Sequence, residues 1–406
     1  MRGAGPPGGG RPGGYPVAAF YTPLKHPCER EASGDREIAR TLMEGLRACG
    51  FEPELASRLL TWRRGFEPAD AEGLERAAAL TAARLVRRYR RRPAGRRPHL
   101  WMTYQNYYRC PDLLGPPITT ALDIPYVLVD TAVSTKSRRT AFRPWVSAAR
   151  LALRRADLIF AMSPRDVPRL AALRGPGFAA DRLCLLPPAV DLTPFEASAG
   201  HEATTRAELA QWFASGNAPV LLCVAMMRTT DKLDSYRLLA AALARLAADT
   251  PVRPWRLLVV GDGPARRNVE AALEVLPADR VYLLGALEPQ ALPSLYLSAD
   301  LLAFPGIGDA LGLVYLEAAA AGLPVIACHG PGPDVMVAPG GGLLTEPTPA
   351  AFAAGLARLL DDPAERRRMG ATARRFVAEE RSLQTFHCRL QNGLARLSLS
   401  PPLPHR

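Results

Sequence analysis

The chain has 406 residues, of which 48% are hydrophobic and 22% are charged. These values are ordinary for a globular protein of two or three domains, and they exclude a disordered, collagen-like or disulfide-stapled chain. The formal net charge of +12 lies entirely in the first half, because residues 1–200 hold 31 Lys and Arg against 19 Asp and Glu, whereas residues 201–406 hold 20 of each. This asymmetry predicts different partners for the two halves.

Several signals of other protein classes are absent from the sequence. The seven cysteines form no Cys-x-x-Cys, the histidines show no metal-binding spacing, and no Asp-x-Asp occurs, so we expect free thiols and neither a metal nor a bound cofactor. Residues 1–14 are rich in Gly and Pro without an apolar core, which predicts a disordered tail and not a signal peptide. The longest apolar run, near 220–227, is too short to span a membrane. A cytoplasmic protein is expected.

The first half alternates between short apolar runs and segments of helical spacing. Strands are predicted at residues 17–21, 54–57, 100–104, 126–129, 158–162 and 183–186. Helices are predicted at residues 35–49, 70–91, 140–155 and 164–173. A polar stretch of small residues at 197–217 is typical of a linker.

The second half alternates more regularly. Strands are predicted at 219–225, 256–260, 281–284, 300–304 and 324–328. Helices are predicted at 235–248, from 264 to about 275, at 289–298 and at 312–321. This alternation predicts an α/β fold of two doubly wound, Rossmann-like domains, whose parallel sheets face each other across a cleft and bind ligands at the carboxyl ends of the strands.

Two glycine motifs raise the question of a dinucleotide. Residues 304–328 (FPGIGDALGLVYLEAAAAGLPVIAC) hold a Gly-x-Gly-x-x-x-Gly between a strand and a helix. A dinucleotide site needs a charged ribose selector at the end of the next strand, but that strand ends at Cys328 and His329. The turn Gly-Asp-Gly at 261–263 has Arg266 in place of the third glycine. NAD(P) binding is therefore not predicted.

Two acids in the 304–328 segment suggest a different ligand. Asp309 lies in the loop before the predicted helix, and Glu317 follows it after seven intervening residues. The backbone amides of Gly312 and Leu313 at the helix start can receive a phosphate, Glu317 can reach ribose hydroxyls, and Asp309 faces the sugar. The alternative is a capping Asp and a solvated Glu. Glu317 has apolar neighbours, however, and a carboxylate there needs a partner.

This segment resembles the donor-site signature of family-4 glycosyltransferases of the GT-B fold. The resemblance rests on Asp309-x₇-Glu317, the following AAAAGLPVIA, the glycine-rich loop at 329–332 and the sequence GGLL at 341–344. The family usually has two glutamates, and Asp309 is one methylene shorter. The resemblance extends over nearly the whole chain from about residue 17. It implies a tail at 1–14, an acceptor-binding domain at 15–205, a donor-binding domain at 206–375 and a closing helix at 376–398 that crosses back.

The resemblance also implies roles for residues outside this segment. Arg228 and Lys232 resemble the Arg and Lys that clamp the donor diphosphate, and Lys232 is one of only three lysines in the chain. The alternative for this pair is a surface loop. Leu287 follows a predicted strand and is a candidate contact for the nucleobase.

The N-terminal half matches the family less closely. Gly34 and Asp35 lie in a segment that resembles the family's glycine loop, where backbone amides approach the donor phosphates. Lys25 and Gln105 are candidates on the acceptor side. Gln105 stands at the expected position of a family histidine, and a second histidine is replaced within residues 130–134.

The resemblance implies a glycosyltransferase that moves a sugar from a nucleotide-sugar to a saccharide or lipid-linked glycan, with retention of configuration and without a metal. Two alternatives stay open. One is a GT-B enzyme of another reaction, namely a nucleotide-sugar epimerase or a phosphorylase. The other is a degenerate protein that binds a nucleotide-sugar without transfer, which the Asp309 and Gln105 replacements keep open.

The predicted helix at 70–91 carries much of the positive charge. Leu74, Ala78, Leu85 and Tyr89 form an apolar stripe, and the arginines between Arg84 and Arg97 lie mostly off it. A solvated face is the simpler interpretation. The functional interpretation is attachment to anionic lipid at the inner face of the cytoplasmic membrane, with an acceptor that is anionic or lies in that membrane. No aromatic platform accompanies the arginines, so nucleic acid is not predicted.

Overall fold

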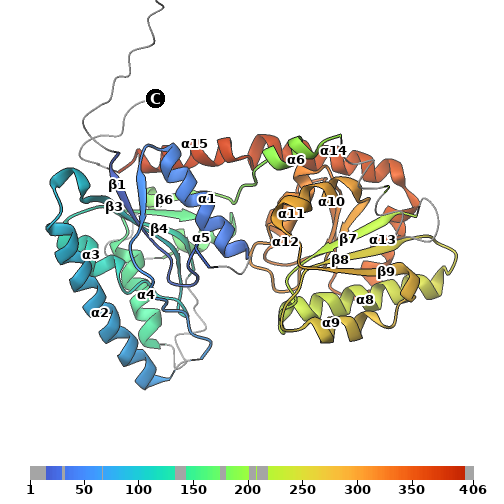
Figure 1. Ribbon diagram of the computed structural model, residues 1–406, viewed down its shortest axis with the longest axis horizontal. Helices are drawn as coiled ribbons and strands as arrows, with labels where there is room; N and C mark the ends of the chain where they lie inside the picture. Colours follow the sequence, from blue (N-terminus) through green and yellow to red (C-terminus); the bar gives the residue numbers. More distant parts are fainter. Residues whose placement is uncertain are drawn as a thin grey trace, which may run out of the picture. The chain divides into compact units, whose positions relative to one another are not determined.

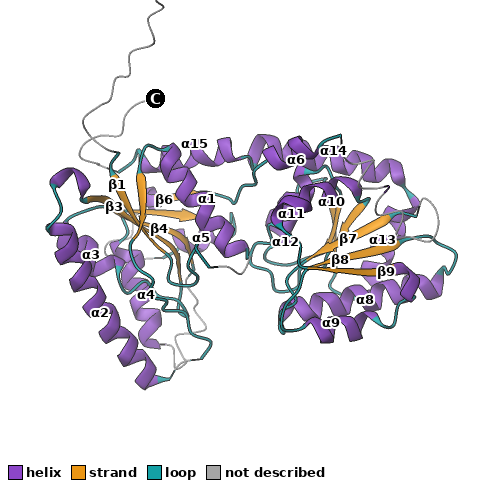
Figure 2. Cartoon of the chain, viewed as in Figure 1, coloured by secondary structure: helices purple, strands orange, loops and turns teal. Residues whose placement is uncertain are grey.

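The computed structural model describes residues 15–29, 33–65, 67–132, 143–173, 180–200, 207 and 218–397. The chain divides into two compact units: unit 1 comprises residues 1–187 and 386–406, and unit 2 comprises residues 188–385. In each unit, helices cover both faces of a central sheet (Figures 1 and 2).

The sheet of unit 1 has six parallel strands in the order β2-β1-β3-β4-β5-β6. The strands are β1 (Val17–Tyr21), β2 (Glu52–Leu55), β3 (Pro98–Asn106), β4 (Tyr126–Thr131), β5 (Leu158–Ala161) and β6 (Leu183–Leu185). Its helices are α1 (Gly34–Ala48), α2 (Pro68–Arg90), α3 (Gly115–Leu122), α4 (Arg143–Arg155), α5 (Asp166–Ala171) and the 3₁₀ turns η1 (Ala94–Arg96) and η3 (Ala180–Arg182). Strand β1 is buried at every residue, as its continuous apolar sequence predicts.

The sheet of unit 2 also has six parallel strands, in the order β12-β11-β10-β7-β8-β9. The strands are β7 (Val220–Val224), β8 (Arg256–Val260), β9 (Val281–Gly285), β10 (Leu301–Ala303), β11 (Val325–Cys328) and β12 (Gly342–Thr345). Its helices are α6 (Thr193–Ser198), α8 (Asp231–Asp249), α9 (Arg266–Leu273), α10 (Leu292–Ser298), α11 (Val314–Ala320), α12 (Pro333–Met336), α13 (Pro349–Asp361), α14 (Pro363–Glu380) and the 3₁₀ turns η4 (Ala278–Arg280) and η5 (Pro289–Ala291).

The two parallel sheets confirm the predicted α/β class and the two Rossmann-like domains. The unit boundary at 187–188 lies earlier than the predicted 205–206. The reason is that α6 packs against α10, and its Phe195 is buried in the core of unit 2. Most of the predicted linker at 197–217, and the predicted tail at 1–14, lie outside the described residues.

The predicted closing helix at 376–398 consists of two helices in the structure. Helix α14 ends at Glu380, and α15 (Leu383–Leu394) begins three residues later. From residue 386 onward the chain belongs to unit 1. A Cβ on Gly45 of α1 would lie only 2.8 Å from Leu390 Cδ2, so α15 packs closely on α1 at this glycine.

Both sheets reverse their strand order at one point. In unit 1 the chain passes from β1 to β2 on one side and then to β3 on the other; in unit 2 it passes from β7 outward to β9 and then to β10 on the other side of β7. Loops that leave such a strand pair diverge and open a crevice at the carboxyl edge of the sheet. The candidate residues are therefore sought at the ends of β1 and β3, and of β7 and β10.

Candidate functional site

At the switch point of unit 2, a lysine from the segment after β7 meets an acid from the loop after β10. Lys232 Nζ lies 2.7 Å from the Asp309 carboxylate, and the two side chains are 21% and 10% exposed. The same ammonium lies 4.7 Å from the centre of the Phe304 ring. The carboxylate and the ring hold the lysine side chain in one place, so its positive charge is fixed at the crevice before any ligand arrives.

The loop after β10 is fixed to α8 and to the loop after β11. The Ile307 amide donates to Ser235 Oγ (2.9 Å), and the Gly332 amide donates to the Asp309 carbonyl (2.7 Å). Gly308 has a φ of +70°, and a Cβ there would lie 2.4 Å from Asp231 Cγ. Only glycine satisfies both conditions, so this close approach of backbone to helix explains one glycine of the Gly-x-Gly motif.

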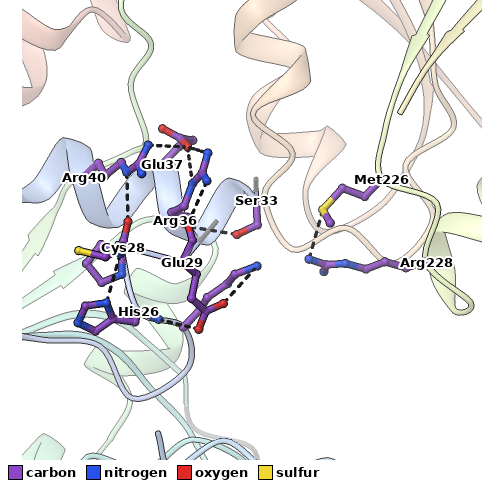
Figure 3. A network of polar contacts seen from close by, with 11 residues as sticks. His26, Cys28, Glu29, Ser33, Arg36, Glu37, Arg40, Met226 and Arg228 are labelled. Carbon is purple, nitrogen blue, oxygen red and sulfur yellow. Dashed lines mark hydrogen bonds and ion pairs between the residues drawn. The ribbon is translucent and has the colours of Figure 1, made fainter. Parts of the chain in front are cut away.

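Arg228 lies in the loop after β7 and is exposed. Its Nη2 lies 3.4 Å from Met226 Sδ (Figure 3), and it forms no ion pair with the described residues. The Gly-Asp-Gly turn after β8 supports this loop, because the Met227 amide donates to the Asp262 carbonyl at 2.9 Å. A Cβ on Gly263 would lie 2.5 Å from the Met227 carbonyl oxygen. The turn therefore packs against the loop that carries Arg228.

Glu317 has a phenol as its partner. Tyr296 of α10 donates its hydroxyl to Glu317 Oε2 at 2.6 Å, and burial together with the neighbouring Glu317 charge raises the pKa of Tyr296. The phenol is therefore a permanent donor that fixes the carboxylate. Sequence reasoning required such a partner but could not identify it, because the tyrosine lies 21 residues earlier.

Helix α11 is shorter than predicted. It begins at Val314 instead of residue 312, so Gly312 and Leu313 precede the helix and Glu317 lies in its first turn, not its second. Gly312 has a φ of +92°, and a Cβ there would lie 3.4 Å from Asp309 Oδ2. The predicted amides therefore belong to the loop that carries Asp309.

Leu287 lies in the loop after β9, half-buried against the core of unit 2. It shares the carboxyl edge with the other candidates but is separated from them by β8.

In unit 1 the segment after β1 is held against α1 (Figure 3). The buried Arg36 donates to the Glu29 carbonyl at 3.1 Å, and Ser33 caps α1 by accepting from the Arg36 amide at 3.3 Å. Lys25 pairs with Glu29 at 3.8 Å, and its side chain is 11% exposed. Gly34 is exposed at the start of the helix.

Two candidates with different predicted roles meet at the carboxyl edge of unit 1. Gln105 Nε2 donates to Asp35 Oδ1 at 2.8 Å. Asp130, at the end of β4, was not a candidate. Burial first, and then the charges of Asp35 and Asp166, raise the pKa of Asp130 to about 7. Gln105 and Asp130 have backbone φ values of +73° and +55°, which residues other than glycine rarely adopt. Such strained, desolvated positions cluster at functional sites.

A buried acid that sequence reasoning missed, Asp112, fixes the end of β3 through hydrogen bonds. Asp112 is 1% exposed and accepts from the Thr103 hydroxyl and the Tyr126 phenol, each at 2.5 Å, and from two backbone amides. Its own amide donates to Asn106 Oδ1 at 3.0 Å. Because every oxygen is satisfied, Asp112 acts as a structural anchor for the end of β3.

The described residues contain no group of three His, Cys, Asp or Glu side chains that could hold a metal ion.

The family model for group 1 glycosyl transferases matches residues 206–376. The chain is 34% identical over 227 residues to the D-inositol 3-phosphate glycosyltransferase of Nocardia farcinica (strain IFM 10152). The aligned part covers 54% of this chain and about half (48%) of that protein. It is 32% identical to the 2-deoxystreptamine glucosyltransferase of Streptomyces kanamyceticus, over 66% of this chain and 67% of that protein.

Two solved structures share the fold. The sucrose-phosphate synthase (tll1590) of Thermosynechococcus elongatus has a TM-score of 0.68 at 20% identity, over 93% of this chain and 98% of that one. Anabaena Alr3699/HepE, in complex with UDP, has a TM-score of 0.69 at 17% identity, over 94% of this chain and 100% of that one. These matches confirm the predicted resemblance in its broader form, while the subdivision into family 4 stays a prediction. The chain belongs to the group 1 glycosyl transferases and has the GT-B fold.

Proposed function

We propose that this chain transfers a sugar from a nucleotide-sugar, bound by unit 2, to a hydroxyl of a saccharide or lipid-linked glycan, bound by unit 1. The proposal rests on the ion pair at the switch point of unit 2, where Lys232 Nζ lies 2.7 Å from the Asp309 carboxylate. It combines a fixed cation with a carboxylate at the edge where open α/β sheets bind ligands.

The chemical problem is the negative charge that builds on the departing diphosphate. In the proposal Lys232 and Arg228 stabilise that charge, together with the backbone amides of Gly312 and Leu313, so that no metal is needed. The sugar's bond to the diphosphate oxygen breaks, the acceptor oxygen bonds to the same carbon, and the acceptor's proton passes to the departing diphosphate. We propose retention of configuration, as in the family resemblance.

The remaining candidates position the donor. Glu317, fixed by Tyr296, accepts from ribose hydroxyls, and Leu287 contacts the base. Asp309 has two tasks in the proposal: it orients Lys232 and contacts the transferred sugar. Asp35 is a proposed donor contact of unit 1, and its hydrogen bond from Gln105 connects it to the proposed acceptor residues.

Thermal unfolding against a panel of UDP-, GDP- and ADP-sugars tests donor binding, because a ligand of the folded state stabilises it by mass action. We expect nucleotide-sugars of one base to raise the Tm in proportion to the logarithm of their concentration. An unchanged Tm with every donor would contradict the proposal. Donor binding without release of nucleoside diphosphate would favour the alternative of a binding protein without transfer.

The basic end of α2 is a proposed membrane contact. The predicted apolar stripe is buried, which confirms the orientation of the helix. Arg88 and Arg92 pair with Glu54, and Arg96 pairs with Glu52. Arg84, Arg87 and Arg91 form no ion pair with the described residues, and with Arg88 they line a surface hollow of about 470 Å³. In the described part of the chain, no helix has the length and apolar character of a membrane span.

Replacing Arg84, Arg87 and Arg91 together with alanine is expected to weaken binding to phosphatidylglycerol-containing vesicles by about 100-fold at low salt, since each cation near the surface contributes about 1 kcal/mol. Vesicle sedimentation measures this, with neutral phosphatidylcholine vesicles as the reference. The matched control replaces Arg237, Arg245 and Arg267, three exposed arginines of unit 2. Equal vesicle binding by both triple variants would assign the α2 arginines to solubility alone.

A further inference from the structure

Three aspartates, Asp35, Asp130 and Asp166, lie near one another at the carboxyl edge of unit 1, although the N-terminal half carries the whole positive excess of the chain. Gln105 Nε2 donates to Asp35 of α1 at 2.8 Å, and Asp130 of β4 lies close enough to Asp35 for that charge, after burial, to raise its pKa. Neither carboxylate forms an ion pair with any residue in the described ranges. The third acid of this edge, Asp166 of α5, pairs with Arg169 at 3.5 Å. Among the residues that the structure describes, no cation therefore pairs with Asp35 or Asp130.

Unpartnered polar groups adjoin this acid pair. The Tyr104 hydroxyl is buried and has no hydrogen-bond partner among the described residues, and the side chain is 1% exposed. The charges of both Asp35 and Asp130 raise the pKa of Tyr104, after its burial, so the phenol lies close to the two acids. Thr22 is 2% exposed, and its hydroxyl is unpartnered too. It follows Tyr21, whose register partner is Thr103, so Thr22 lies beside Tyr104.

A second tyrosine adds an aromatic surface. Tyr107 is half-buried, and after burial and Cys110 the charges of Asp35 and Asp130 contribute to its raised pKa. Carboxylates that lack a cation, next to tyrosine rings and unpaired hydroxyls, match the needs of an ammonium group. Such a group carries the missing charge, donates several hydrogen bonds and is attracted to aromatic faces.

The arginines of α2 do not neutralise this edge. Helices that connect parallel strands run opposite to the strands, so the end of α2 and the turn η1 lie where β3 begins, at the amino edge of the sheet. Arg96 accordingly pairs with Glu52, the first residue of β2. The expectation of an anionic acceptor rested on the charge of the half as a whole. At the carboxyl edge, the charges that act on Asp130 are those of two other acids, Asp35 and Asp166.

We propose that the acceptor carries an ammonium group, which binds between Asp35 and Asp130 with Gln105, Tyr104 and Tyr107 around it. This inference rests on the proposed function, and it narrows the acceptor class to amino-bearing saccharides or polyols. Asp35 and Asp130 are binding residues for the acceptor in this proposal.

Four probes on one ring test the charge preference directly: methyl glucoside, its 6-amino-6-deoxy derivative, the corresponding 6-acetamide and the 6-phosphate. Calorimetric titration of the full chain at pH 8 keeps the alkylammonium charged and lies above the raised pKa of Asp130. We expect the amine to bind at least about tenfold more tightly than the neutral probes, and the phosphate to bind most weakly.

Asp130→Asn and Asp35→Asn are each expected to reduce the preference for the amine to less than about threefold. Asparagine tolerates the left-handed backbone at 130 as aspartate does, so Asp130→Asn should fold, and thermal unfolding checks this. The matched control is Glu72→Gln, which removes the same charge from an exposed side chain of α2 (72% exposed) and should keep the preference.

The inference would be overturned if the four probes bound equally, if none of them bound, or if the phosphate bound most tightly. A preference for the amine that survives Asp130→Asn would overturn it as well. Failure of the proposed function is a different result. It would appear as the absence of any nucleotide-sugar binding or turnover, whatever the order of the four probes.

Discussion

Lys232→Ala is expected to reduce kcat for sugar transfer by about 100- to 1,000-fold, the usual cost of removing one preorganised group that stabilises developing negative charge. The ammonium is held 2.7 Å from Asp309 and over the Phe304 ring, and alanine supplies no positive charge in its place. Steady-state release of nucleoside diphosphate measures the loss.

A stability effect must be separated from this catalytic one. Lys232→Ala leaves Asp309, whose side chain is 10% exposed, without its cation, at a cost of about 1–3 kcal/mol of unfolding free energy. The double variant Lys232→Met, Asp309→Asn removes both charges and should recover most of the stability without recovering turnover. Recovery of turnover in this double variant would show that the pair is structural.

Glu317→Gln is expected to raise the donor KM by about 10- to 100-fold, because a hydrogen bond to a charged group contributes about 1.5–3 kcal/mol. Glutamine keeps the shape and can still accept from Tyr296, so the fold should be unaffected. Donor titrations at saturating acceptor measure the KM.

Two further variants test whether the change in donor KM comes from the Glu317 carboxylate itself. Tyr296→Phe removes the phenol that fixes the carboxylate at 2.6 Å, and should produce a smaller increase of the same kind. Glu274→Gln, at an exposed position at the end of α9, should leave the KM unchanged. A donor KM that is insensitive to Glu317→Gln would remove this residue from the ribose contact.

Strands with continuous apolar sequences were predictable, because a buried parallel strand needs apolar side chains on both faces. Strand β8 matches its predicted range at both ends. Strand β12 was missed because its four half-buried residues, GLLT, follow a glycine-rich loop. Helix α3 was missed because its sequence begins with Gly115 and two prolines; prolines mark the first helical turn as readily as a loop.

The contacts that define the site were not accessible from local patterns. Lys232 and Asp309 are 77 residues apart, and Gln105 and Asp35 are 70 residues apart. Sequence identified all four as candidates, but the strand order determines which of them meet. The neighbouring carboxylates of Asp35 and Asp130 were also hidden, because a net charge averages the α2 arginines at one edge of the sheet with the carboxylates at the other.

Sugar transfer is tested most directly by following the transferred sugar itself. The full chain is incubated with the donor that thermal unfolding selects and with an amino-bearing acceptor, and proton NMR records the anomeric signals over time. We expect a new glycosidic signal with the donor's configuration, formed in step with nucleoside diphosphate and absent from the Lys232→Met, Asp309→Asn variant. A donor that binds but never releases its diphosphate would contradict this expectation.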